Sequence, residues 1–248
     1  MLGPFVNSGL RAGQPISRYA LELWLRSPRG RQVQADEERE LRRVLPDLFG
    51  RHVLQIGSWG RGDRLLQSSE MLHRAVVGTT PDLGAHALAS PEQLPVPDKT
   101  VDAALLPHTL EFSRSPHPVL REASRILTDR GRLFILGFDP WSAWAWRQYL
   151  GLRYRAFPPG ARFVSRRRLC DWLELLDFEV MEIRDYGARF LDRWFAAGPC
   201  GYLIVAKKRI FPMSLIGRVA RDSVQPMVRP LPLPGAHASA HPPRKPTT

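Results

Sequence analysis

A cluster of glycines directly after a short apolar run most restricts what this chain can fold into. The run at 51–56 leads into three closely spaced glycines, Gly57, Gly60 and Gly62. Residues 63–72 are compatible with a helix, and a β-rich stretch follows at 75–79. A strand, a glycine loop, a helix and a second strand in this order form a βαβ unit, and such units build parallel sheets. Because glycine has no Cβ, the loop backbone can lie directly against a cofactor; plain turn chemistry is the alternative.

Strand-like and helix-like segments continue to alternate as far as residue 206. Apolar runs predict strands at 85–89, 101–106, 132–138, 178–184 and 200–206. Helical periodicity predicts helices at 118–128 and 165–176. The continuous run at 101–106 is typical of a strand buried on both faces of a sheet. We therefore expect an α/β fold with a central, mostly parallel sheet.

Segments of different character flank this α/β region of residues 51–207. Apolar stripes predict helices at 15–27 and 35–49, with a break at residues 27–30 and Gly50 as a helix cap. We expect residues 1–50 to form a helical extension packed on the core. Residues 208–248 form a basic, proline-rich tail, which we expect to be largely disordered apart from a short helix at 209–222.

Composition limits the classes of partner. The net charge is +12, but residues 207–248 alone carry eight Lys or Arg and one Asp, so nucleic-acid binding through the tail stays open without being favoured. No apolar run approaches the roughly 20 residues that span a bilayer, and a secretory leader is not evident, so we expect a cytoplasmic protein. Cys170 and Cys200 lack the spacing of metal ligands, so we expect no metal site and two partly buried thiols.

Three further stretches have a recognisable order and spacing. Residues 91–106 read PEQLPVPDKTVDAALL, residues 118–127 read PVLREASRIL, and residues 131–138 read GRLFILGF. Together with the glycine loop they resemble the class I methyltransferases of the type 11 group, over about residues 50–140. The continuation at 137–142 is similar to an uncharacterised bacterial subgroup. The resemblance implies a Rossmann-like fold, S-adenosyl-L-methionine as cofactor, and methyl transfer to an unknown acceptor, which we expect to be a small molecule.

The resemblance also implies which residues contact the cofactor. These are Gln55, Gly57, Gly60, Gly62, Thr80, Ser90, Glu92, Leu94 and Pro107. Three of them stand where the family has acids: Gln55 before the first glycine, Thr80 after the second strand, and Ser90 before the E-x-L-P run. Gln55 brings no negative charge to a sulfonium cofactor, and Thr80 cannot accept from both ribose hydroxyls. Asp82 could substitute for Thr80.

Two more features leave a second function open. Only 14 residues separate Thr80 from Pro95, so we expect the second crossover helix to be missing. Trp59 stands where the family has a small residue, and it either stacks on a ligand or fills space in the core. Losing two charge-assisted hydrogen bonds would weaken cofactor binding by about two to four powers of ten. The alternative is a methyltransferase-fold protein with a degenerate cofactor site that serves as a binding or interaction module.

Candidate catalytic groups follow the later strands, because ligands of such sheets bind at the carboxyl ends of the strands. His108 is the candidate general base, since its unperturbed pKa is near neutrality, and Glu111 could pair with it. Asp139 before Pro140 predicts a turn. An aromatic group after the strand at 132–138 predicts a lid helix or an apolar substrate pocket; it comprises Trp141, Trp144, Trp146 and Tyr149. A run of arginines predicts a solvated face or an anion contact; it comprises Arg162, Arg166, Arg167 and Arg168.

Overall fold

The computed structural model of this chain describes residues 18–60, 62–79, 84–142, 161–187 and 199–209. The predictions made for Thr80, Asp82, Trp144, Trp146 and Tyr149, and for the tail beyond residue 209, lie outside these residues. The division into an extension at 1–50, a domain at 51–207 and a tail stays a prediction.

The described elements are as follows. The helices are α1 (Arg18–Arg26), α2 (Pro28–Val44), α3 (Thr109–Phe112), α4 (Pro116–Ile126) and α6 (Arg166–Leu175), with a 3₁₀ turn η1 (Arg64–Leu66). The strands are β1 (His52–Ile56), β2 (His73–Gly78), β3 (Ala87–Leu88), β4 (Val101–Pro107), β5 (Leu127–Phe138), β6 (Phe178–Tyr186) and β7 (Gly201–Lys208).

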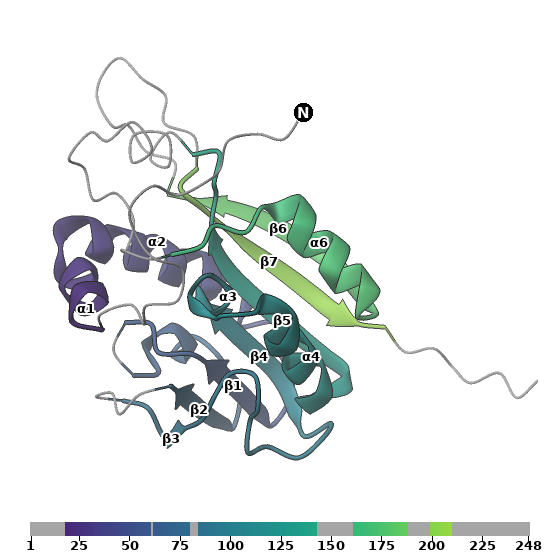
Figure 1. Cartoon of the computed structure of the whole chain (residues 1–248). Helices are drawn as coiled ribbons and strands as arrows, with labels where there is room; N and C mark the ends of the chain where they lie inside the picture. Colours follow the sequence, from purple (N-terminus) through teal and green to yellow (C-terminus); the bar gives the residue numbers. More distant parts are fainter. Residues whose placement is uncertain (1–17, 61, 80–83, 143–160, 188–198, 210–248) are drawn as a thin grey trace, which may run out of the picture. The chain divides into compact units, whose positions relative to one another are not determined.

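The strands form one seven-stranded sheet in the order β3-β2-β1-β4-β5-β7-β6 (Figure 1). The pairs from β3 to β5 are parallel, whereas β7 runs antiparallel between β5 and β6. The chain order therefore reverses at β1 and β4, and a ligand crevice of an open α/β sheet is expected at such a point, outside the carboxyl ends of the strands. The expectation of a central, mostly parallel sheet is confirmed.

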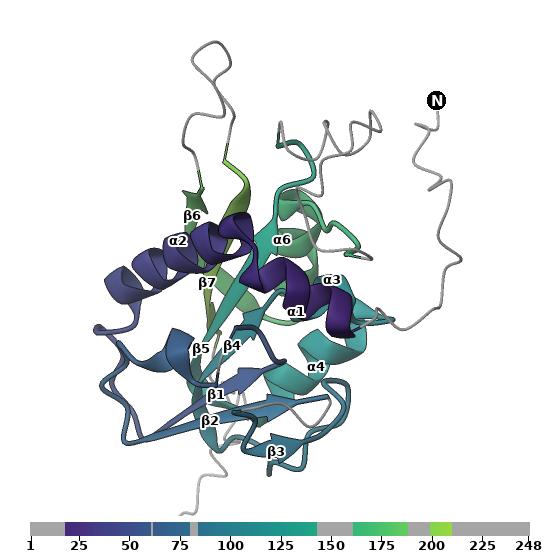
Figure 2. The ribbon, with the colours of Figure 1, turned by 90° about the vertical axis from the view of Figure 1, so that its left-hand side faces the viewer.

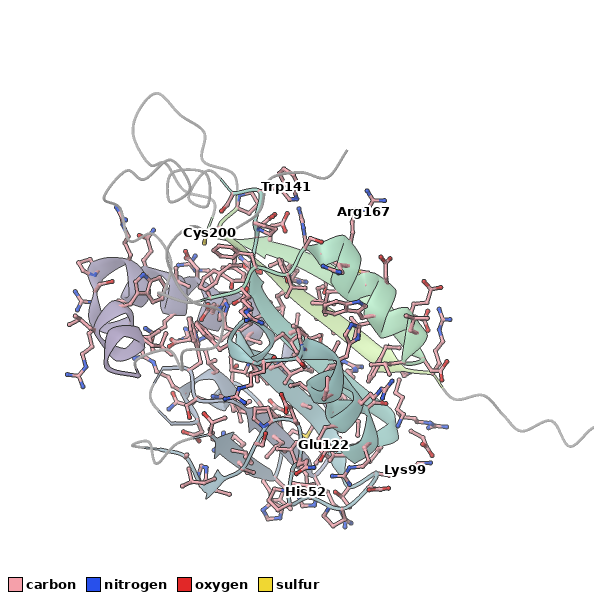
Figure 3. The ribbon with its side chains drawn as sticks, in the orientation of Figure 1. His52, Lys99, Glu122, Trp141, Arg167 and Cys200 are labelled. Carbon is pink, nitrogen blue, oxygen red and sulfur yellow. The ribbon has the colours of Figure 1, made fainter. Side chains whose placement is uncertain are left out.

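Helices cover both faces of the sheet. Figure 2 shows α1 and α2 on one face and α3, α4 and α6 on the other. Each layer has its own apolar core, because successive strand residues point to opposite faces. Phe134 of β5 packs with the α2 side, and its neighbours Leu133 and Ile135 pack with the α4 side. Figure 3 labels His52 and Lys99 at the amino end of the sheet and Trp141 and Cys200 at the carboxyl end.

Helix α2 begins earlier than the sequence pattern predicts. The side-chain oxygen of Ser27 accepts from the backbone N–H of Gly30 at 3.1 Å, and Pro28 occupies the first helical turn. Proline is tolerated there because that N–H needs no partner within the helix. The predicted break at residues 27–30 is therefore a helix start. The prediction of Gly50 as cap is also wrong, since α2 ends at Val44.

The corner between α1 and α2 is closely packed. A Cβ on Gly30 would clash with the backbone of Trp24 and Leu25 in α1. The Gln34 side chain of α2 donates to the Leu25 carbonyl at 3.0 Å. The two helices therefore form one unit across the sheet.

The predicted helix at 63–72 is wrong, because only η1 forms there. Leu65 and Leu66 are buried nonetheless. The Ser69 hydroxyl accepts from the Met71 N–H at 3.3 Å, a local bond that competes with helical pairing. Between β2 and β3 only residues 79–86 remain, which is too short for a full crossover helix with its connections, as expected.

Two of the motifs that carry the family resemblance meet in a structural clamp. Arg125 of α4 donates to the Val96 carbonyl at 2.8 Å and pairs with Glu122 at 2.7 Å and with Asp98. The Glu122 carboxylate accepts from the Leu94 N–H at 2.6 Å. Arg125 holds the pKa of Glu122 below its usual range. This Glu122–Arg125 clamp fixes the segment before β4, so these motifs stabilise the fold.

Two further expectations concern the thiols and membranes. Cys170 and Cys200 are free thiols, and Cys200 is buried. Among the described helices, none combines the length and the apolar character that a bilayer crossing requires. The cytoplasmic location stays a prediction.

Candidate functional site

The glycine loop after β1 has a backbone that only glycine adopts readily. Gly57, Gly60 and Gly62 have φ values of 102°, 77° and 57°. Gly57 and Gly62 are half-buried, whereas Gly60 is exposed. The nearest neighbour of an added Cβ would be Thr109 at Gly57, Gln34 at Gly60 and Gly84 at Gly62. Gln34 of α2, Thr109 of α3 and Gly84 therefore lie against the loop, while Gly60 stays exposed.

Trp59 fills the space between this loop and α2. Its side chain is only 2% exposed. Its indole N–H donates to Oε2 of Glu37 at 2.6 Å, and its ring lies 6.1 Å from that of Trp24 and 6.0 Å from that of Phe138. Of the two interpretations of Trp59, core filling is the one that the structure shows.

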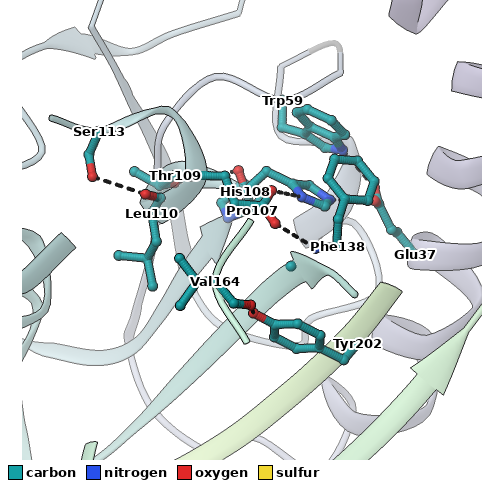
Figure 4. Close-up of polar contacts among 12 residues, drawn as sticks. Glu37, Trp59, Pro107, His108, Thr109, Leu110, Ser113, Phe138, Val164 and Tyr202 are labelled. Atoms are coloured by element: carbon teal, nitrogen blue, oxygen red, sulfur yellow. Dashed lines mark hydrogen bonds and ion pairs between the residues drawn. The ribbon is translucent and has the colours of Figure 1, made fainter. Parts of the chain in front are cut away.

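His108 is the centre of a buried charged cluster at the end of β4 (Figure 4). Nδ1 lies 2.6 Å from Oε2 of Glu111, and Nε2 lies 2.7 Å from Oε1 of Glu37. The imidazole lies between the rings of Trp59 and Phe138, at 4.1 and 4.0 Å. Burial alone would lower its pKa, but the two carboxylates outweigh it and raise the pKa of His108 to about 9. His108 is thus an imidazolium at neutral pH, with both ring nitrogens occupied.

Glu111 and Tyr186 complete the cluster. Oε1 of Glu111 accepts from the Phe138 N–H at 2.6 Å, and burial raises the pKa of this carboxyl in spite of His108. The Tyr186 hydroxyl of β6 lies 3.2 Å from Oε1 of Glu37. Burial raises the pKa of this phenol well above its usual range. We call Glu37, His108, Glu111 and Tyr186 the Glu37–His108 cluster.

The cluster places the carboxyl groups of Glu37 and Glu111 and the imidazole of His108 in the interior, and all of its residues are buried. Side chains of Glu37 and His108 are 0% exposed. Taking such charges out of water is costly, and the cost is offset only by close pairing. Buried titratable groups with shifted pKa values are typical of functional sites. The cluster lies at the carboxyl rim of the sheet, where ligands of this fold bind.

The other predicted cofactor residues fall into two groups. Gln55 and Pro107 are buried at the ends of β1 and β4, beside the glycine loop and His108. Ser90, Glu92 and Leu94 belong to the segment after β3, where the Ser90 hydroxyl accepts from the Glu92 N–H and Leu94 bonds to the Glu122–Arg125 clamp.

Two polar atoms at the glycine loop have no partner. The amide of Gln55 donates to the Gly57 carbonyl at 3.0 Å, whereas its oxygen Oε1 is buried and unpaired. The hydroxyl oxygen of Ser58 is likewise buried and unpaired. Buried polar atoms without partners are rare and indicate a strained or ligand-binding site.

The remaining polar candidates have structural partners. Asp139 forms the predicted turn by accepting from the Trp141 N–H at 2.9 Å. Arg166 pairs with Asp139 and Asp185, whereas Arg167 is exposed to solvent. Trp141 is 65% exposed.

The sequence interpretation missed Glu37 and Tyr186. Glu37 and Leu41 of α2 and the capping residue Leu45 follow one another at intervals of four residues, so their side chains lie on one face of the helix. That spacing could have identified a glutamate on the buried face. Tyr186 lies at the end of β6, 149 residues from Glu37, and no local pattern connects them.

Comparisons with known proteins agree with this geometry. A methyltransferase-domain family of type 11 matches residues 67–135. The uncharacterised protein YafS of Escherichia coli K12 is 32% identical over 209 residues, covering 81% of this chain and 86% of YafS. This chain belongs to that type 11 methyltransferase family. Among solved structures, a methyltransferase from Thermotoga maritima, described as a possible histamine N-methyltransferase, has a TM-score of 0.60 at 21% identity, covering 76% of this chain and 94% of its own.

A second solved methyltransferase, from Archaeoglobus fulgidus, has a TM-score of 0.58 at 18% identity, covering 77% of this chain and 100% of its own. At these identities the two structures establish the Rossmann-like fold. Both are S-adenosylmethionine-dependent. The match to a methyltransferase-domain family indicates methyl transfer as the class of reaction.

The polar atoms at the glycine loop suit S-adenosylmethionine chemically, but protein side chains fill the space beside them. The unpaired oxygens of Gln55 and Ser58 can accept from a bound ligand. The buried side chain of Trp59 lies in the same loop and fills the space towards α2. A cavity of about 160 Å³ lies elsewhere, lined by α2 and η1 residues such as Glu38 and Arg64, and ligand pockets are typically about 300–1,000 Å³. We call this arrangement, in which Glu37 binds both the Trp59 indole and Nε2 of His108, the closed form of the site.

Proposed function

We propose that this methyltransferase transfers a methyl group from S-adenosylmethionine to a small-molecule acceptor at the carboxyl ends of β1 and β4. One observation carries the proposal: of the three buried side-chain polar atoms without a hydrogen-bond partner among the described residues, two are the oxygens of Gln55 and Ser58 beside the glycine loop, and the third is Nε of Arg184. A ligand at this rim would satisfy the two oxygens. The cofactor supplies an activated methyl group bound to a cationic sulfur.

The residues of the chain have separate roles in this proposal. Gln55, Gly57, Gly60, Gly62 and Pro107 line the cofactor side. Thr80, Ser90, Glu92 and Leu94 are kept as proposed contacts for its adenosine part, by the family resemblance alone.

His108 and Glu111 form the acceptor side. Glu111 holds Nδ1 of His108 at 2.6 Å, which leaves Nε2 as the atom that would accept a proton from the acceptor. In the closed form Nε2 is already bound to Glu37. The general-base role therefore requires that Glu37 withdraw.

A second function is favoured by the closed site. Trp59 is buried against α2, and Gln55 brings no charge to the loop, so a methyltransferase fold without productive cofactor binding would serve as a binding or interaction module. The two functions differ in one measurable property, the affinity for the cofactor.

Calorimetry with S-adenosylmethionine and its demethylated product distinguishes them. The proposal expects micromolar dissociation constants for the full chain. Gln55→Leu should weaken binding at least tenfold, because it removes the unpaired oxygen. Gln67→Leu is the matched control, because Gln67 lies directly after η1 and is exposed. This variant should bind the cofactor like wild type. No binding at millimolar ligand would favour the interaction module.

A further inference from the structure

The face of α2 that packs on the domain makes ion pairs as well as apolar contacts. Glu38 pairs with Arg64 of η1 at 2.6 Å, and Glu40 lies 3.8 Å from Arg184 of β6. Those two arginines remain partly exposed. Glu37 differs from both glutamates, because its partners His108, Trp59 and Tyr186 are all buried. Among the three, only Glu37 reaches the candidate site.

Glu37 contacts two parts of the candidate site. Oε2 accepts from the Trp59 indole of the glycine loop, and Oε1 binds Nε2 of His108 at the end of β4 (Figure 4). On the same helix, one turn earlier, Gln34 lies beside Gly60, which stays exposed. The position of α2 therefore affects access to Trp59 and to Nε2 of His108.

We propose that Glu37 is a latch: its carboxylate holds the α1–α2 unit over the glycine loop, and its release opens the loop to the cofactor and frees Nε2 of His108. The proposal rests on the proposed function. It makes Glu37 a positioning residue, which acts on the reaction through Trp59 and His108 without contacting the acceptor.

The latch also sets the protonation of His108. In the closed form Glu37 and Glu111 both stabilise the imidazolium, and a protonated imidazole cannot act as a base. When Glu37 withdraws, one of the two negative neighbours is lost and solvent reaches Nε2. Losing the negative charge of Glu37 lowers the pKa of His108, whereas contact with water raises it, because burial disfavours the charged ring. Opening therefore couples cofactor access to the release of Nε2, the atom that would accept the proton.

Glu37→Gln tests the latch, because glutamine keeps the size of the side chain and can still accept from Trp59 but cannot form the ion pair. The matched control is Glu40→Gln, which removes the same charge one turn later in α2, where the partners are Arg43 and Arg184. We would measure amide hydrogen exchange of α2 and of residues 57–60, and the affinity for the demethylated cofactor, in full-length proteins.

The expected result for Glu37→Gln is exchange at least tenfold faster in both segments, and binding at least tenfold tighter, with Glu40→Gln close to wild type in both. Unchanged exchange, or weaker binding by Glu37→Gln, would overturn the latch. Faster exchange with no ligand bound by any variant would support the latch and reject the proposed function, so the two failures are distinguishable.

Wild-type protein provides a second test that does not depend on a variant folding. Raising the pH from 7.5 to about 9.5 removes the proton of His108. The carboxyl groups of Glu37 and Glu111 then lie on either side of a neutral ring. The groups that face His108 are Glu37 from α2, Glu111 from α3 and Tyr186 from β6, with the rings of Trp59 and Phe138. The exchange rate of α2 relative to α6 should rise about tenfold; a constant ratio would contradict the latch.

Discussion

Two ion-pair networks lie on opposite faces of the same sheet, and they differ in exposure. The Glu122–Arg125 clamp on the α4 side connects two stretches of the family resemblance, and the Arg125 side chain is 34% exposed. The Glu37–His108 cluster on the α2 side is fully buried. Water can replace the bonds of the clamp when they break, whereas it cannot reach the closed cluster. The difference suggests that the clamp stabilises the fold and that the cluster controls a site.

The largest expected effect comes from breaking the buried network. Glu111→Ala removes the buried carboxyl group that binds Nδ1 of His108 and accepts from the Phe138 N–H. Removing one partner of a buried pair costs about 3–5 kcal/mol, so the free energy of unfolding should fall by that amount in urea titrations. A loss below about 1 kcal/mol would show that the cluster is not closed in solution.

The pH dependence of stability gives the next largest effect. The folded pKa of His108, about 9, lies above its unfolded value of 6.5, so its contribution is complete below pH 6.5 and is lost as the pH rises through 9. Between these values the free energy of unfolding should fall by up to about 1.4 kcal/mol per pH unit.

His108→Gln is the control for this slope, because it removes the titrating group from the cluster. Urea midpoints measured from pH 6.5 to 9 should decline in wild type and stay level in the variant. Equal slopes in the two proteins would place the titration in another group.

The smallest expected effect is in the clamp. Glu122→Ala removes an acceptor from the Leu94 N–H and a partner from Arg125, both of which water can replace in part. The expected loss is about 1–2 kcal/mol, with no change in the affinity for the demethylated cofactor. A loss as large as that of Glu111→Ala would remove the distinction between the two networks.

The sequence predicted the parts of the fold that depend on local pattern. The strands at 51–56 and 101–106 were found because their apolar runs match burial in a sheet. The helix at 63–72 was wrong, since its apolar residues are buried in an irregular segment. The start of α2 was wrong because Ser27 and Pro28 signal a helix start as well as a turn.

The candidate site was predicted only in part for a similar reason. Gly57 and His108 follow neighbouring strands, so topology brings them to one rim. Glu37 and Tyr186 reach that rim from α2 and from β6, and their contacts depend on how a whole helix and an antiparallel strand pack. Local spacing carries no information about such contacts. Which contacts the cofactor makes stays a prediction.

Hydrogen exchange of α2 in wild type, with and without saturating demethylated cofactor, tests the central claim most directly. A ligand usually protects the protein around it, but here it must displace Glu37 from Trp59 and His108. The account predicts faster exchange in α2 when the ligand is bound, while α6 is unchanged. Slower or unchanged exchange in α2 at demonstrated saturation would contradict it.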